Sequence, residues 1–212
     1  MTLRALHRSS AYLVAAFACL HIANHLAGLW GVATHIAFMD SARLVYRSVL
    51  VEVVLLLCVA FQAGSGLTLV VRGWRQRRGF VPWLQALSGA YLSFFLLVHV
   101  SAIVSGRVLL NLDTNFYFAA AGFHVPPYPF FFVPYYFLAV VALFTHLGCA
   151  AYWQLQERSR LARVLVLAVP ASVSAVLALL IVLLLAGQLQ PFEVPAKYKA
   201  TYDKARYGAS RP

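Results

Sequence analysis

The chain has 212 residues, of which 62% are hydrophobic and only 11% are charged. Because ordinary soluble domains carry about 25% charged residues, this composition excludes a soluble or disordered chain and predicts an integral membrane protein in contact with lipid. The 17 Lys and Arg residues outnumber the 6 Asp and Glu residues, but they lie between apolar runs rather than on one folded face, which excludes a nucleic-acid-binding module.

Five apolar stretches are long enough to cross a hydrocarbon core of about 30 Å as helices. In chain order they cover residues 10–30, 43–71, 83–108, 129–153 and 164–187. Backbone groups cannot stay unpaired in lipid, and the alternating pattern of a membrane barrel is absent, so each stretch is predicted to be an α-helix. We therefore expect an all-α integral membrane protein with a bundle of five transmembrane helices. Residues 1–212 would form a single membrane domain that ends in a basic tail, residues 188–212.

The orientation of the bundle follows from its short loops. The first span follows Arg4 and Arg8 and continues through HIANHLAGLW without a clean cleavage site, so we interpret it as a retained helix and not as a signal peptide. RGWRQRRG joins the second and third spans, and QERSRLAR joins the fourth and fifth. By the positive-inside rule both loops face the cytoplasm. The N-terminus is then cytoplasmic and the C-terminus outside, in a multi-pass protein of the cytoplasmic (inner) membrane.

The longest outer connection, residues 109–128, is rich in aromatic and apolar side chains. Such a stretch can lie on the membrane surface instead of extending into water. Two interpretations remain open for it: a cover over a site that opens outward, or an interfacial belt without a function of its own.

Titratable side chains within the spans mark candidate functional sites, because isolated polar groups are costly in a membrane. The candidates are His21, His25, Glu52, His99 and His146, joined by the amide of Gln62. At the helical rise of about 1.5 Å per residue, His21 or His25 should meet His99 in the outer half of the membrane. Gln62 and His146 should share a level in the inner half. Histidines that only bond between helices are the alternative, but cofactor ligation explains this excess of histidines better.

A b-type haem fits the outer pair, because its iron takes two axial imidazoles and its flat ring slots between helices. The small residues Ser88–Ala90 and Gly64–Gly66 would let the ring approach the backbone. Copper or zinc would need three or more ligands at one depth, and no such pattern is present. His25 lies on the same helix face as His21. It is the alternative first ligand, an accessory residue that bonds a propionate or quinone oxygen, or an interfacial histidine.

Four stretches in order carry a family resemblance: LHRSS with LHIANHLAG, FMDSARLVYRSVLVEVV with FQAGSGLTLV, LQALSGAYLSFFLLVHV, and YYFLAVVALFTHLGCAAYW. Together they resemble the five-helix, di-haem cytochrome b membrane anchor of succinate:quinone oxidoreductases and the related fumarate reductases. The resemblance covers residues 5–153, and the fifth span matches by position only. It implies an outer haem on His21 and His99, and an inner haem with His146 as one ligand.

Two positions depart from the family's pattern. The family's second-helix ligand stands four residues before a glycine, where this chain has Gln62 before Gly66. A glutamine amide is a poor ligand for haem iron. The family's arginine before the SG pair of the third span is Ala86 here. We therefore expect one haem b, held at its iron by His21 and His99, and no normally ligated second haem at His146.

The resemblance implies an electron-transfer subunit that connects flavoprotein and iron–sulfur subunits on the cytoplasmic side with membrane quinone. The chain has no flavin-binding glycine fingerprint and no cysteine cluster for iron–sulfur centres, so chemistry on succinate would belong to those partners. Glu52 is a candidate catalytic proton acceptor for quinol oxidation, or it pairs with Arg43 or Arg47. The alternative functions are a stand-alone single-haem cytochrome for quinone redox or haem handling, and a haem-free structural or assembly protein.

Overall fold

The computed structural model describes residues 2–207 and places none of them in a β-strand. Within that range, five helices are long and apolar enough to cross a membrane. They are α1 (Leu3–Ala27), continued by the 3₁₀ turn η1 (Gly28–Trp30), α3 (Val49–Arg72), α4 (Phe80–Val108), α6 (Pro129–Gln154) and α7 (Arg160–Leu185). The shorter elements are α2 (Val32–Tyr46), η2 (Trp74–Gln76), α5 (Phe116–Ala120), η3 (Ala121–Phe123), α8 (Ala196–Lys199) and α9 (Lys204–Tyr207). The predicted all-helical, five-span architecture is confirmed.

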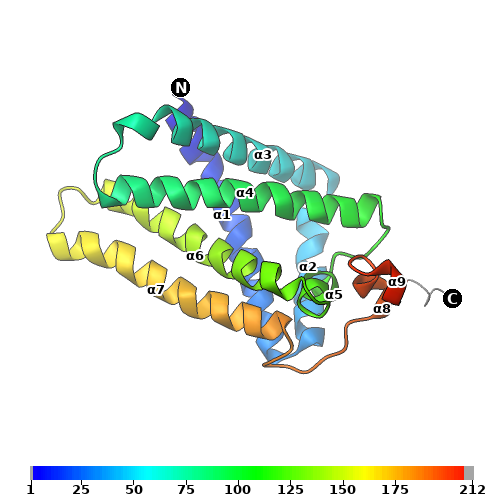
Figure 1. Cartoon of the computed structure of the whole chain (residues 1–212). Coiled ribbons are helices and arrows are strands. Elements are labelled where there is room, and N and C mark those ends of the chain that lie inside the picture. Colours follow the sequence, from blue (N-terminus) through cyan, green and yellow to red (C-terminus); the bar gives the residue numbers. More distant parts are fainter. Residues whose placement is uncertain (1, 208–212) are drawn as a thin grey trace.

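The five long helices form a ring (Figure 1). In it α1 packs against α3 and α7, α3 against α4, α4 against α6, and α6 against α7. The contact between α6 and α7 is close because Gly148 lies on it: a Cβ there would come within 2.9 Å of the Val166 carbonyl oxygen. α1 and α4 are not neighbours in this ring, because α3 lies between them on one side and α6 and α7 on the other. Long side chains of α1 and α4 can therefore meet in the interior of the ring.

Successive long helices run in opposite directions (Figure 1), so the N-terminus and both arginine-rich loops lie at one end of the bundle. We call this the arginine end. The segment after α7 lies at the other end, together with α2 and α5, and we call that the capped end. The side of the membrane that each end faces stays a prediction.

The second predicted span is wrong at its start. Residues 43–46 belong to the separate helix α2, and the membrane-length helix α3 begins only at Val49. The chain turns before α2 at Gly31, whose φ of 122° lies in the left-handed region that glycine adopts readily. Hydropathy merged the two helices because apolar residues stand on both sides of the short break at Arg47 and Ser48.

Two other spans begin earlier than predicted, because a side chain caps the N-terminus of each helix. Thr2 Oγ1 accepts a hydrogen bond from Ala5 N at 3.3 Å, so α1 begins at Leu3 and not near residue 10. Ser159 Oγ likewise accepts from Ala162 N at 3.3 Å, so α7 begins at Arg160 and not near residue 164. These caps satisfy backbone N–H groups that the first helical turn leaves free, and they carry polar residues into the helices.

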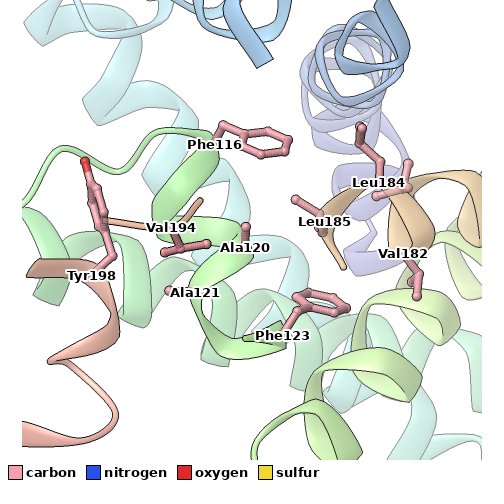
Figure 2. Packing of buried hydrophobic residues seen from close by; sticks show 10 residues of the cluster. Phe116, Ala120, Ala121, Phe123, Val182, Leu184, Leu185, Val194 and Tyr198 are labelled. Atoms are coloured by element: carbon pink, nitrogen blue, oxygen red, sulfur yellow. The ribbon is translucent and has the colours of Figure 1, made fainter. Parts of the chain in front are cut away.

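A buried apolar cluster holds the capped end together (Figure 2). Its side chains come from α5 and η3, from the last turns of α7 and from the segment through α8: Phe116, Ala120, Ala121, Phe123, Ile181, Val182, Leu184, Leu185, Val194 and Tyr198. Burying one large apolar side chain contributes about 1.5–3 kcal/mol. The connection over residues 109–128 is therefore packed as a cover on the bundle, which favours the first of its two interpretations.

The predicted basic tail is also part of this cap as far as Tyr202, which packs against the buried cluster. Gln190 donates its Nε2–H to the Leu29 carbonyl at 3.0 Å, and Tyr198 is 2% exposed. Residues 208–212 of the predicted tail lie outside the described residues. Composition did not reveal this packing because the buried Val194 and Tyr198 are isolated apolar residues next to the charged Glu193, Lys197 and Lys199.

Ion pairs tie α2 to the cover. Arg43 lies 2.8 Å from an oxygen of Asp113 and 3.2 Å from one of Asp40. Arg47 donates to Thr114 Oγ1 at 3.0 Å. These contacts hold α2 beside the end of α1, where the candidate functional residues gather.

Candidate functional site

The imidazoles of His21 on α1 and His99 on α4 meet edge-on, with ring centroids 6.0 Å apart and an interplanar angle of 65°. Both rings are partly exposed. Among the described residues, no side chain or backbone group forms a hydrogen bond with a ring nitrogen of either histidine. The sequence placed these two residues at one depth in the outer half, and the structure brings them together near the capped end.

A phenylalanine one turn earlier stacks on each of these imidazoles. Phe17 lies over His21 at 5.8 Å with an interplanar angle of 15°. Phe95 lies over His99 at 5.0 Å with an angle of 14°. The i,i+4 spacing places each pair on one helix face. Each ring is thus held in a fixed orientation by its own helix, as a ligand residue requires.

His21 and His99 come from different long helices, α1 and α4, and their rings lie 6.0 Å apart at the centroids. Within residues 2–207, no group of three or more His, Cys, Asp and Glu side chains could hold a bare metal ion. A cofactor that needs only two protein ligands, such as a b-type haem, would be held by His21 and His99.

His25 lies between this pair and α2. Its ring centroid is 4.8 Å from that of His21 and 5.3 Å from that of His35 on α2. Asn24 Nδ2 lies 3.3 Å from His35 Nε2. Asn24, His25 and His35 are all buried, at 6%, 9% and 2% exposure. The site is therefore a cluster of four histidines that continues into the cap.

His35 was missed by the sequence analysis, which placed it in a loop between spans. The signal was present in the apolar spacing of Val32, Ile36 and Met39, which puts His35 on the inward face of a helix. Burial, followed by the charges of His21 and Arg43, lowers the pKa of His35 to about 4. The ring is therefore neutral at physiological pH.

A cavity opens between α1 and α2 next to this cluster. His21 and Asn24 are polar side chains in its wall, and Phe17, Met39 and Tyr46 are among the apolar and aromatic ones. The ring of Tyr46 meets Phe17 edge-on at 5.4 Å. The side of α1 that carries His21 is therefore not fully covered by α2.

His146 forms a second level toward the arginine end. Its Nδ1 lies 3.1 Å from the Gln85 carbonyl, which can only accept, so Nδ1 carries the proton and Nε2 stays basic. Ser88 Oγ is 3.2 Å from the same nitrogen. A hydrogen bond to the second ring nitrogen is the usual support of a ligand histidine, so His146 on its own could still bind a metal centre.

Gln62 and His146, predicted to share a level, have no hydrogen bond to each other among the described residues. The Gln62 amide donates to the His7 carbonyl and to Ser10 Oγ, both at 2.6 Å, and so turns toward α1. His7 itself, which the sequence analysis passed over, has its Nδ1 2.7 Å from Ser65 Oγ. These bonds join residues in the early turns of α1 to residues in the second half of α3, and helix periodicity alone does not predict such partners.

The small residues predicted to make room for the haem ring instead receive histidines. A Cβ on Gly89 would lie 2.8 Å from His146 Cε1. One on Gly66 would lie 3.4 Å from His7 Cε1 and 3.2 Å from Ser93 Oγ. These glycines therefore provide close side-chain packing between helices, which their sequence positions alone could not distinguish from space for a cofactor.

Glu52 lies in the first turn of α3 and forms an ion pair with Arg107 on α4. Neither Arg43 nor Arg47, the predicted partners, contacts it: Arg43 binds Asp40 and Asp113, and Arg47 binds Thr114. Glu52 is thus paired with an arginine, as one of its two interpretations predicted, but the arginine is Arg107, 55 residues away in the chain.

Comparisons with known proteins add no relative: no family model, curated protein or solved structure matches the chain.

Proposed function

We propose that this protein is a haem b-containing membrane anchor that transfers electrons between a partner redox subunit and membrane quinone, as in succinate:quinone oxidoreductases. His21 and His99 would be the axial ligands. The observation that carries the proposal is the 6.0 Å separation of their rings across the interior of a five-helix ring. The resemblance of residues 5–153 to such anchors supports the same assignment.

The haem-free structural alternative depends on hydrogen bonds between helices, which contribute about 0.6 kcal/mol each in a membrane protein. His7 and His146 have such bonds. In the described part of the chain, the ring nitrogens of His21 and His99 have none. Since two polar rings in a membrane span are costly without partners, this difference favours a ligand role for His21 and His99.

The chain's own residues position the two imidazoles. Phe17 and Phe95 hold the two imidazoles by stacking, and α1 and α4 hold them at one depth. The cover formed by residues 109–128 packs against the capped end of the bundle. A bound haem would supply one-electron chemistry at its iron.

The test is the visible spectrum of the purified full chain, oxidised and after reduction with dithionite. We expect the sharp bands of a low-spin b-type haem in the unmodified protein. His21→Ala and His99→Ala should each abolish the low-spin signal. His124→Ala is the matched control, because His124 lies in the cap and bonds the Leu185 carbonyl at 2.9 Å. A colourless unmodified protein, or an unchanged spectrum in His99→Ala, would refute the proposal.

A stand-alone single-haem cytochrome would give the same spectrum. Co-purification separates it from an anchor: flavoprotein and iron–sulfur subunits should remain with the anchor after mild detergent extraction. Quinol-dependent reduction of the haem in that preparation then tests electron exchange with quinone.

A further inference from the structure

Two buried ring nitrogens beside the proposed ligand pair lack a hydrogen-bond partner among the described residues: Nδ1 of His25 and Nδ1 of His35. A buried polar group without a hydrogen-bond partner is destabilising. Two such groups on neighbouring rings, 5.3 Å apart at their centroids, point to a ligand that both can bind.

The hydrogen bond from Asn24 determines which ring nitrogen of His35 carries the proton. The Asn24 amide nitrogen only donates, so His35 Nε2, at 3.3 Å, must accept. In a neutral ring the single proton is then on Nδ1. The free nitrogen of His35 is therefore a donor, which suits an oxygen acceptor on the ligand.

The surroundings of His21 and His99 differ on their two sides. Toward the arginine end, each ring is stacked on a phenylalanine, Phe17 or Phe95. Toward the capped end come His25, one turn further along α1, and then His35 on α2. A ligand between the pair thus meets an apolar side and a side with hydrogen-bond donors.

Haem has the same asymmetry: it carries both its carboxylates on one edge of an otherwise apolar ring. We propose that His25 and His35 donate hydrogen bonds to these carboxylates and so orient the haem with its acidic edge toward the capped end. The inference rests on the proposed function. It assigns His25 to the accessory role and gives His35 and Asn24, which orients it, a part in cofactor binding.

The experiment compares haem with its dimethyl ester, in which both carboxylates are blocked. The full chain in detergent is reconstituted with either compound, and the affinity is measured from the low-spin Soret band. Because hydrogen bonds to a charged group are strong, the unmodified protein should bind the ester at least about tenfold more weakly. In His35→Leu this discrimination should fall to about threefold, because only His25 still donates.

His124→Leu, a substitution elsewhere in the cap, is the matched control and should keep the full discrimination. His25→Gln should retain the low-spin spectrum; loss of that spectrum would make His25 an axial ligand and overturn the inference. If His35→Leu does not fold, His35→Gln replaces it and should show reduced discrimination. Equal binding of haem and ester by the unmodified protein, or full discrimination in the His35 variant, also overturns it. The absence of any low-spin spectrum with haem in the unmodified protein would instead refute the proposed function.

Discussion

The carboxylate of Glu52 on α3 is paired with the guanidinium of Arg107 on α4, and both side chains are partly buried, at 25% and 33% exposure. The pair joins the first turn of one span to the last turn of the next, near the capped end. A carboxylate held in this way already has a structural role, whether or not it also takes up protons.

Glu52→Gln should therefore lower the melting temperature slightly, in line with the roughly 0–1 kcal/mol of a solvent-accessible ion pair. Arg107→Gln should have a similar effect, and the double variant should be less destabilised than the sum of the two. The rate of quinol-dependent haem reduction should be unchanged in Glu52→Gln. A slower rate with an intact haem spectrum would instead identify Glu52 as a proton acceptor.

Two glycines on facing helices should respond differently to the same substitution. Gly89→Ala places a Cβ 2.8 Å from His146 Cε1 and should destabilise the protein by about 1–3 kcal/mol. Gly64 has no atom within 4 Å of such a Cβ, so Gly64→Ala should be neutral or stabilising by up to about 1 kcal/mol. Thermal unfolding in detergent measures both. Equal effects would mean that His146 does not pack on Gly89.

The protein should bind about one haem per chain. His146 has a basic Nε2, but Gln62 is engaged with His7 and Ser10 and provides no second ligand. The pyridine haemochrome assay gives the ratio of haem to protein. A ratio near two would contradict the prediction, and a fall to one in His146→Ala would then place the second haem on His146.

Acid should destabilise the haem-free protein through His35. Its pKa is lowered to about 4 in the folded state, by burial and then by the charges of His21 and Arg43, from 6.5 in a free ring. Between these values the unfolded state binds the proton more strongly. The stability contributed by neutral His35 is thus complete above pH 6.5 and is lost as the pH falls toward 4.

This loss amounts to up to about 3 kcal/mol for a shift of this size. Melting temperatures in detergent from pH 7 to pH 4.5 should fall, and they should fall less steeply in His35→Leu. An equally steep fall in that variant would show that other groups dominate the acid sensitivity.

Sequence reasoning was most accurate for features with a fixed helical geometry. The five spans, their alternating direction and the common depth of His21 and His99 all follow from hydropathy and the rise per residue. These are properties of single helices or of neighbouring loops. They need no knowledge of which helix packs against which.

Partners distant in the chain could not be obtained in the same way. The predicted depth of Gln62 did not reveal that its amide binds His7 and Ser10. Glu52 binds Arg107, where Arg43 or Arg47 was the predicted partner. A helix position determines depth, whereas the partner depends on how each helix is rotated about its axis and on which neighbours it has.

By itself, then, the sequence determined that this chain is a five-span helical membrane protein with two histidines at one level, because helix length and periodicity are local properties. Only the tertiary structure decided that His21 and His99 meet edge-on, that α2 brings His35 beside His25, and that the tail closes the capped end. Those relationships arise from the ring packing of the helices and from the turn at Gly31, which bring together residues that the chain itself keeps apart.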